Sequence, residues 1–266
     1  MIWLQQRSEM ASRNPVLIRA TGETLGQGRT ETTSAPAGFG TSTSMTMNDV
    51  IVKSGILFGL LVAGALLGWQ WAVTNSGVVF TAAIVGLVLG LVNTFKRNVS
   101  PVLVMAYAAT EGVFLGGLSK IFDVAYAEQA PQIVSQAVIG TLTTFGVMLF
   151  LYQSNIIKVN SKFMKIFTIA MVSYLVIALA SFVAGAFFKV GEGWGFYGVG
   201  QIGLLLCIAG VALAAFSLVM DFELIQQGVR SGLPEKESWR MAFGLTVTLV
   251  WLYTEILRLL AILNER

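Results

Sequence analysis

The chain has 266 residues, of which 55% are hydrophobic and only 12% are charged. This composition is far from that of a soluble domain of the same length, and it indicates a polytopic membrane protein. The formal net charge of +3 is accounted for by a basic membrane face, so nucleic acid is not expected as a partner.

The first 47 residues differ in composition from the rest of the chain. They are rich in Ser, Thr, Gly and Ala and lack any apolar run long enough to bury, so we predict a disordered cytoplasmic tail over residues 1–47. The opening MIWLQQRSEM is followed by polar sequence, which is not the pattern of a secretory signal peptide. Residues 48–266 are then expected to form one transmembrane domain.

Long runs without charge predict seven spans in this domain, because a transmembrane helix needs about 20 apolar residues. The longest run, 42 residues between Lys53 and Lys96, is long enough for two helices, with Asn75-Ser76-Gly77 as the turn between them. The predicted spans lie near residues 54–74, 77–95, 101–122, 133–153, 166–188, 200–222 and 239–262. The expected fold class is therefore an all-α membrane protein, a bundle of seven transmembrane helices.

Basic residues are distributed unequally between the two sets of alternate connections. One set carries nine of them: Lys53, Lys96, Arg97, Lys158, Lys162, Lys165, Arg230, Lys236 and Arg240. The other set carries three: Lys120, Lys189 and Arg266. Because cytoplasmic connections are enriched in Lys and Arg, this asymmetry predicts a cytoplasmic N-terminus and a C-terminus outside. The expected location is the plasma or inner membrane.

Three carboxylates lie among apolar residues: Glu111 in TEGVFLGGLS, Asp221 in SLVMDFELI and Glu255 in VWLYTEILRLL. An ionisable side chain at membrane depth costs roughly 2.5 to 3.5 kcal/mol by insertion scales, so it usually faces the interior of a bundle or a water path. Glu111 is expected about 15 Å into its helix. This depth is near the midplane, where an ion-facing carboxylate would lie.

Three interpretations of these acids remain open. In a structural role, Glu255 pairs with Arg258 one turn later, and Asp221, at the cytoplasmic end of its span, pairs with Lys96 or Arg97. In a cation or proton pathway, the carboxylates supply oxygen ligands of the kind calcium prefers, and two of them held close together share a proton and act as a pH switch. An intramembrane aspartyl protease also needs two acids, but the Leu-Tyr-Thr that precedes Glu255 is unlike the Gly-x-Gly-Asp sequence of such proteases.

The inventory of residues excludes other catalytic classes. The chain has no histidine, which removes Ser-His and Cys-His catalysis. Its one cysteine, Cys207, cannot form an internal disulfide, and zinc is not expected because its sites draw on His and Cys. We expect neither enzymatic activity nor a resident cofactor.

The runs FSLVMDFELIQQG, LVWLYTEILRLLAIL and YAATEGVFLGGLS resemble the helix-six, helix-seven and helix-three segments of the Bax inhibitor-1/YccA family, also called the transmembrane Bax inhibitor motif family. The resemblance runs from about residue 48 to the C-terminus and looks closest to a bacterial branch. It implies a seven-helix bundle with the last helix surrounded by the other six. It also implies a pH-sensitive calcium leak governed by two acids, which fall at Asp221 and Glu255.

Two departures bear on the pair that the resemblance implies. Helix seven of the family often carries Asp where this chain has Glu255. With a turn over residues 231–238, Asp221 and Glu255 are offset by seven residues, or about 10 Å along straight helices. Direct contact then requires a bend or tilt near residues 232–240.

The resemblance also implies a basic partner for the helix-six acid at the end of helix two, which falls at Arg97 or Lys96. Arg97 is favoured because a guanidinium binds a carboxylate through two hydrogen bonds. We therefore expect a calcium or cation leak channel or exchanger gated by protonation of Asp221 and Glu255, the two possible calcium ligands. The alternative is a non-transporting membrane regulator that binds a membrane protease or a stress-response partner.

Overall fold

The computed structural model describes residues 43–75, 77–193 and 195–264. Seven helices in this part of the chain are long and apolar enough to cross a membrane. They are α3 (Met47–Thr74), α4 (Gly77–Phe95), α5 (Pro101–Ala125), α6 (Ile133–Gln153), α7 (Ser161–Phe188), α8 (Gly200–Arg230) and α9 (Glu237–Asn264). Two short 3-10 helices, η1 (Val190–Gly193) and η2 (Gly195–Gly198), connect α7 to α8. The all-α class and the seven spans are confirmed.

Helix α3 begins at Met47, seven residues before the predicted start, because a capping box fixes its first turn. The Thr46 hydroxyl accepts a hydrogen bond from the Asp49 backbone at 3.2 Å, and the Asp49 carboxylate accepts one from the Thr46 backbone at 2.8 Å. Residues 43–47, which the sequence assigned to the tail, thus belong to the described bundle or lead directly into it. The tail before residue 43 lies outside the described residues.

Helix α8 continues to Arg230, eight residues beyond the predicted end of its span. The prediction ended the span just after Asp221, where polar residues begin. The structure differs because Phe222, Ile225 and Gly228 remain buried beyond that point. A helix that stays packed on its neighbours does not end at its first charged residue.

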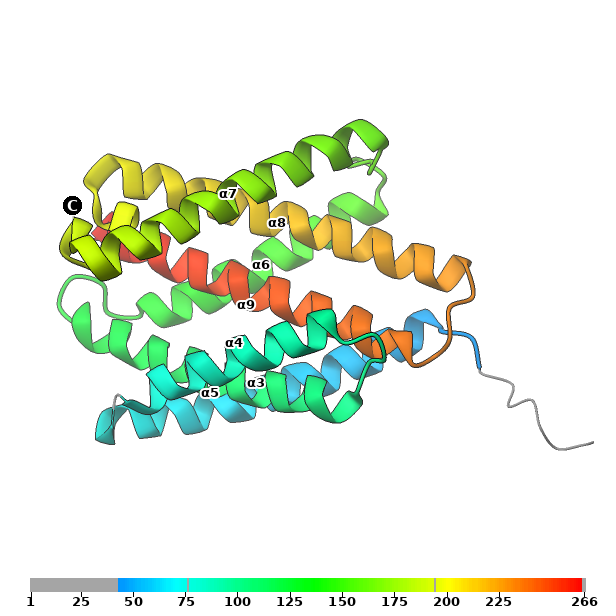
Figure 1. Cartoon of the computed structure of the whole chain (residues 1–266), viewed down its shortest axis with the longest axis horizontal. Helices are drawn as coiled ribbons and strands as arrows, with labels where there is room; N and C mark the ends of the chain where they lie inside the picture. Colours follow the sequence, from blue (N-terminus) through cyan, green and yellow to red (C-terminus); the bar gives the residue numbers. More distant parts are fainter. Residues whose placement is uncertain (1–42, 76, 194, 265–266) are drawn as a thin grey trace, which may run out of the picture. The chain divides into compact units, whose positions relative to one another are not determined.

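Helix α9 lies at the centre of the bundle (Figure 1). It contacts α3, α5, α6 and α8, and Trp251 of α9 also packs on Tyr174 of α7, with 5.8 Å between the ring centroids. Helix α4 instead packs on α5 and α3, and within the described residues it makes no backbone contact with α9. The last helix is central, as expected, but in the described part of the chain it is not surrounded by all six other helices, because α4 lies outside the set whose backbones contact it.

The two ends of the bundle carry different connections (Figure 1). Residues 43–46 and the connections 96–100, 154–160 and 231–236 lie at one end, called here the N-terminal end. The connection 126–132, both 3-10 helices and the end of α9 lie at the other, the C-terminal end. The connections of the more basic set therefore gather at the N-terminal end.

Candidate functional site

Asp221 lies on the face of α8 that packs against α9. A Cβ atom added to Gly244 would lie 3.9 Å from the Asp221 Oδ1 atom, and Thr248 is the polar side chain beside the carboxyl group. The Oδ2 atom is buried and has no hydrogen-bond partner. A buried polar atom of this kind requires a proton, a water molecule or a cation to offset its desolvation.

Asp221 lies deeper than the sequence analysis placed it. Nine residues, or about 13 Å of helix, separate it from the end of α8 at Arg230. Lys96 and Arg97 are exposed at the end of the bundle, and neither forms an ion pair with any described residue. Their backbone carbonyls instead accept hydrogen bonds from Arg240, at 2.9 Å for the Arg97 oxygen. The structure therefore does not bring the expected latch residues to Asp221, because they lie at a different depth.

Glu255 is only 3% exposed, and polar side chains surround it in the C-terminal half of the bundle. Tyr174 donates a hydrogen bond to its Oε1 atom at 2.7 Å, and the Trp251 indole donates one at 3.2 Å. Arg258 Nη1 lies 3.4 Å from the same oxygen, so the structure brings together the two residues that helical spacing paired. Tyr197 donates to the Tyr174 hydroxyl at 2.7 Å, and its ring lies 4.5 Å from the Arg258 guanidinium. Glu255 is thus held by neighbours from α7, η2 and α9.

A cavity of about 660 Å³ borders Glu255. Its polar side is formed by Tyr174, Ser181, Tyr197, Trp251, Glu255 and Arg258. The rest of its lining consists of apolar side chains of α7. The cavity gives the carboxylate a neighbouring space that has both polar and apolar walls.

The two acids of the expected pair lie at different depths. Asp221 faces Gly244 and Thr248, whereas Glu255 lies seven residues beyond Thr248, about 10 Å farther along α9. Among the described residues, no hydrogen bond joins the two carboxyl groups. The offset expected from the sequence is therefore present, and no bend of the chain cancels it. The described residues also contain no group of three or more His, Cys, Asp or Glu able to hold a metal ion.

Glu111 is buried where α5 packs against α4. A Cβ atom added to Gly86 of α4 would lie 2.8 Å from the Glu111 Oε1 atom, so glycine leaves the space that the carboxyl group occupies. Tyr107, one turn earlier on α5, is its hydrogen-bonding neighbour. Glu111 is thus at middle depth, as expected, but it points towards peripheral α4, whose backbone makes no contact with that of α8 or α9 within the described residues.

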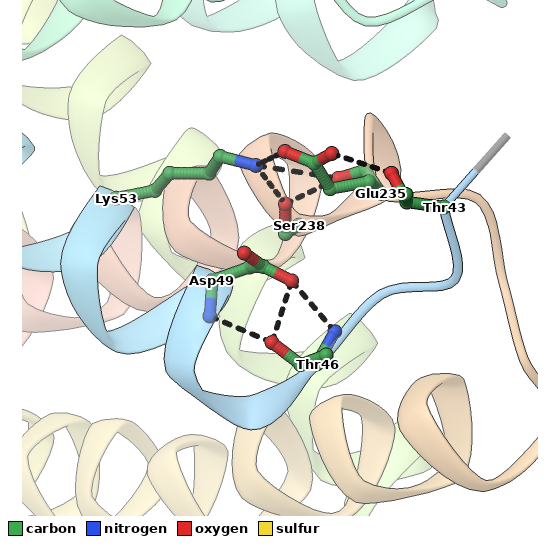
Figure 2. A network of polar contacts seen from close by, with 6 residues as sticks. All are labelled: Thr43, Thr46, Asp49, Lys53, Glu235 and Ser238. Carbon is green, nitrogen blue, oxygen red and sulfur yellow. Dashed lines mark hydrogen bonds and ion pairs between the residues drawn. The ribbon is translucent and has the colours of Figure 1, made fainter.

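Sequence analysis missed a polar network at the N-terminal end, shown in Figure 2. Lys53 Nζ lies 3.0 Å from Glu235 Oε1 and donates to the Ser238 hydroxyl at 2.6 Å. The Thr43 hydroxyl donates to the other Glu235 oxygen at 2.8 Å. The hydrogen bonds from Thr43 and Lys53, together with the Lys53 charge, lower the pKa of Glu235 from its usual value. Partners more than 180 residues apart leave no local pattern by which the sequence could pair them.

A family model described as Bax inhibitor 1 like matches residues 11–265. A search of curated proteins finds no match to the chain. The family match extends over all seven helices and over each of the three buried carboxylates.

Proposed function

Because the chain belongs to the Bax inhibitor 1 like family, we propose that this multi-pass membrane protein is a pH-sensitive cation leak, with calcium as its ion and no enzymatic activity. One observation carries the proposal. Asp221 places a carboxylate oxygen without a partner in the buried contact between α8 and the central helix. A titratable group in such surroundings changes the charge of the contact when it gains or loses a proton, and its ionised form offers calcium an oxygen ligand.

The geometry favours a function in which Asp221 and Glu255 act one after the other along the bundle, without direct contact between them. Asp221 belongs to the N-terminal half of the contact between α8 and α9, which we call the α8–α9 seam, and Glu255 belongs to the C-terminal half. Asp221 is assigned the titrating role, because its buried Oδ2 atom has no hydrogen-bond partner. Glu255 is assigned the role of a fixed ligand, because the donors described above hold it in place. A cation that moves along the seam meets the two acids in turn, without requiring them to touch.

The test is calcium flux into proteoliposomes measured from pH 6 to pH 8. The parent protein should pass calcium increasingly well as the pH rises, because an ionised carboxylate binds the cation. Asp221→Asn should flatten this dependence, whereas Glu255→Gln should lower flux at every pH. Glu223→Gln is the matched control, since Glu223 lies two residues from Asp221 but bonds to Tyr152 and Gln227 near the end of α8.

The proposal fails if the parent protein passes no calcium, or if the calcium flux is unchanged by both substitutions and by the pH. Absence of flux together with specific co-purification of a membrane protease, retained in both variants, would favour a non-transporting regulator. Measurement of flux and of binding on the same preparations separates the two classes of function.

A further inference from the structure

Residues 43–46, called here the strap, are bound to the connection between α8 and α9. Ser44 and Pro234 form an antiparallel bridge. Two backbone hydrogen bonds flank it, from Met45 N to Leu233 O at 2.7 Å and from Glu235 N to Thr43 O at 2.8 Å. A segment that precedes the first transmembrane helix is therefore paired with the segment that joins the last two.

Side chains add a second set of bonds between the strap and the bundle (Figure 2). Glu235 accepts hydrogen bonds from Thr43 of the strap and from Lys53 of α3. Lys53 also donates to Ser238 in the first turn of α9. The strap, α3 and α9 are thus joined around one carboxylate at the N-terminal end.

Met45 is only 2% exposed although it lies outside every helix. It forms a small apolar cluster with Val50 of α3 and Ile225 of α8, and Met241 of α9 packs against the same cluster. A Cβ atom added to Gly228 would lie 2.6 Å from the Met45 methyl carbon, so glycine at that position leaves room for the methionine. The strap therefore inserts one side chain between α8 and α9.

The Met45 cluster lies about one helical turn from Asp221. Ile225 is four residues from Asp221 towards the N-terminal end of the bundle, about 6 Å along α8. On α9, Met241 lies three residues before Gly244, about 4.5 Å along the helix. Met45 therefore lies between the N-terminal end of the seam and the unpartnered Asp221 oxygen.

We propose that the strap is a gate, with Met45 as the plug that closes the N-terminal end of the α8–α9 seam. The proposal rests on the proposed function, in which Asp221 is where the cation binds. The structure shows the closed state. Opening breaks the Ser44–Pro234 bridge and the Glu235 hydrogen bonds and withdraws Met45 from the seam.

The first test locks the strap with a disulfide in a Cys207→Ala background. Ser44 and Pro234 have the hydrogen-bonding pattern of a non-hydrogen-bonded antiparallel pair, whose Cα atoms lie about 4.5 Å apart, within the range that a disulfide spans. The oxidised Ser44→Cys/Pro234→Cys variant should pass calcium several-fold more slowly than the same protein after reduction. Oxidised Ser44→Cys alone is the control. Equal flux before and after reduction, with the disulfide verified by mass, would overturn the gate.

The second test measures access to the seam without measuring flux. Thr248→Cys, also in the Cys207→Ala background, places a thiol beside Asp221, and a charged thiol reagent reports how fast it can be reached in purified protein. Met45→Ala should speed the reaction by roughly tenfold or more, since truncation of a buried methionine removes enough packing energy to shift an opening equilibrium by that factor. Met47→Ala is the matched control, because Met47 is 42% exposed two residues away.

The two tests fail in different ways. If Met45→Ala destabilises the bundle, Glu235→Gln loosens the strap without creating a cavity and should also speed labelling. Unchanged labelling in both variants would overturn the gate. Faster labelling in a protein whose parent passes no calcium would instead refute the proposed function and leave the strap as a barrier.

Discussion

The three buried carboxylates are accommodated in three different ways. Glu255 accepts hydrogen bonds from two aromatic side chains and lies beside Arg258. Glu111 occupies the space left by Gly86 and has Tyr107 as a neighbour. Asp221 keeps one oxygen without a partner. Since an unsatisfied buried acceptor is costly, Asp221 is the acid whose state is most easily changed by a proton or a cation.

Tyr174→Phe should lower the stability of the bundle. The substitution removes the donor closest to Glu255 Oε1, at 2.7 Å, and loss of a partner of a buried charged group costs about 1–3 kcal/mol. The midpoint of thermal unfolding in detergent measures the effect. Tyr197→Phe should cost less, because it removes only the bond to Tyr174 and leaves the bond to Glu255 intact. An equal loss in the two variants would contradict the assignment of Tyr174 as the main support of Glu255.

Glu235→Gln should raise calcium flux without changing its dependence on pH between 6 and 8. The hydrogen bond from Thr43 and the partnership with Lys53 lower the pKa of Glu235. The contribution of the ionised Glu235 to stability is therefore fully present above the usual pKa of about 4.3 and is lost only as the pH falls through the lower folded value. The ion pair is therefore constant across the assayed range. Its loss should raise flux by roughly two- to fivefold, the size expected for an ion pair at the protein surface, since the Glu235 side chain is 46% exposed.

The comparison that checks this prediction is the ratio of Glu235→Gln to parent flux at each pH. A constant ratio identifies the strap as a barrier separate from the pH sensor. A ratio that varies between pH 6 and pH 8, in the way expected for Asp221→Asn, would make the strap itself the source of the pH dependence.

The helices could be predicted from the sequence because each span is a continuous apolar run. The spans 77–95 and 133–153 coincide with α4 and α6. The start of α3 and the end of α8 differ from the predicted bounds. The Thr46 capping box and the buried side of α8 beyond Asp221 depend on specific contacts, which hydropathy does not measure. The strap was missed for the same reason, since its bridge joins residues far apart in the sequence.

Helices α3 and α5 approach each other through glycines, and one of these glycines gives a test of element packing. A Cβ atom added to Gly116 would clash with the backbone carbonyl of Ala65. Gly116→Ala should therefore lower the free energy of unfolding by about 1–3 kcal/mol, measured by thermal unfolding in detergent. Gly146→Ala on α6, which would meet nothing within 4 Å, is the matched control and should leave stability unchanged or slightly raised. Equal stability of both variants would show that the two helices can separate without cost.

Across the whole molecule, the sequence identified the residues of the candidate site better than their arrangement. Glu255 and the Asp221 Oδ2 atom are buried on the helices expected for them, because intramembrane acids are recognisable from hydropathy alone. Their partners are not, since Tyr174, Trp251 and Thr248 resemble ordinary apolar or small polar residues of a span. The register between α8 and α9 decides which side chains lie beside each acid. This register depends on how far α8 remains packed beyond Asp221.

The orientation of the whole bundle decides which side of the membrane the strap faces, and therefore from which side it would control access to Asp221. The nine basic residues of one set of connections against three of the other predict that the N-terminal end, with the strap, faces the cytoplasm. Alkaline phosphatase fused after residue 266 should then be active and green fluorescent protein at the same place dark, because the first folds outside the cytoplasm and the second within it. The same reporters fused after Asn160, in the connection between α6 and α7, should give the opposite result. Fluorescence at the C-terminus would show that the bundle has the opposite orientation, with the Met45 plug on the outer side. Calcium would then reach Asp221 from the cytoplasm without passing the strap.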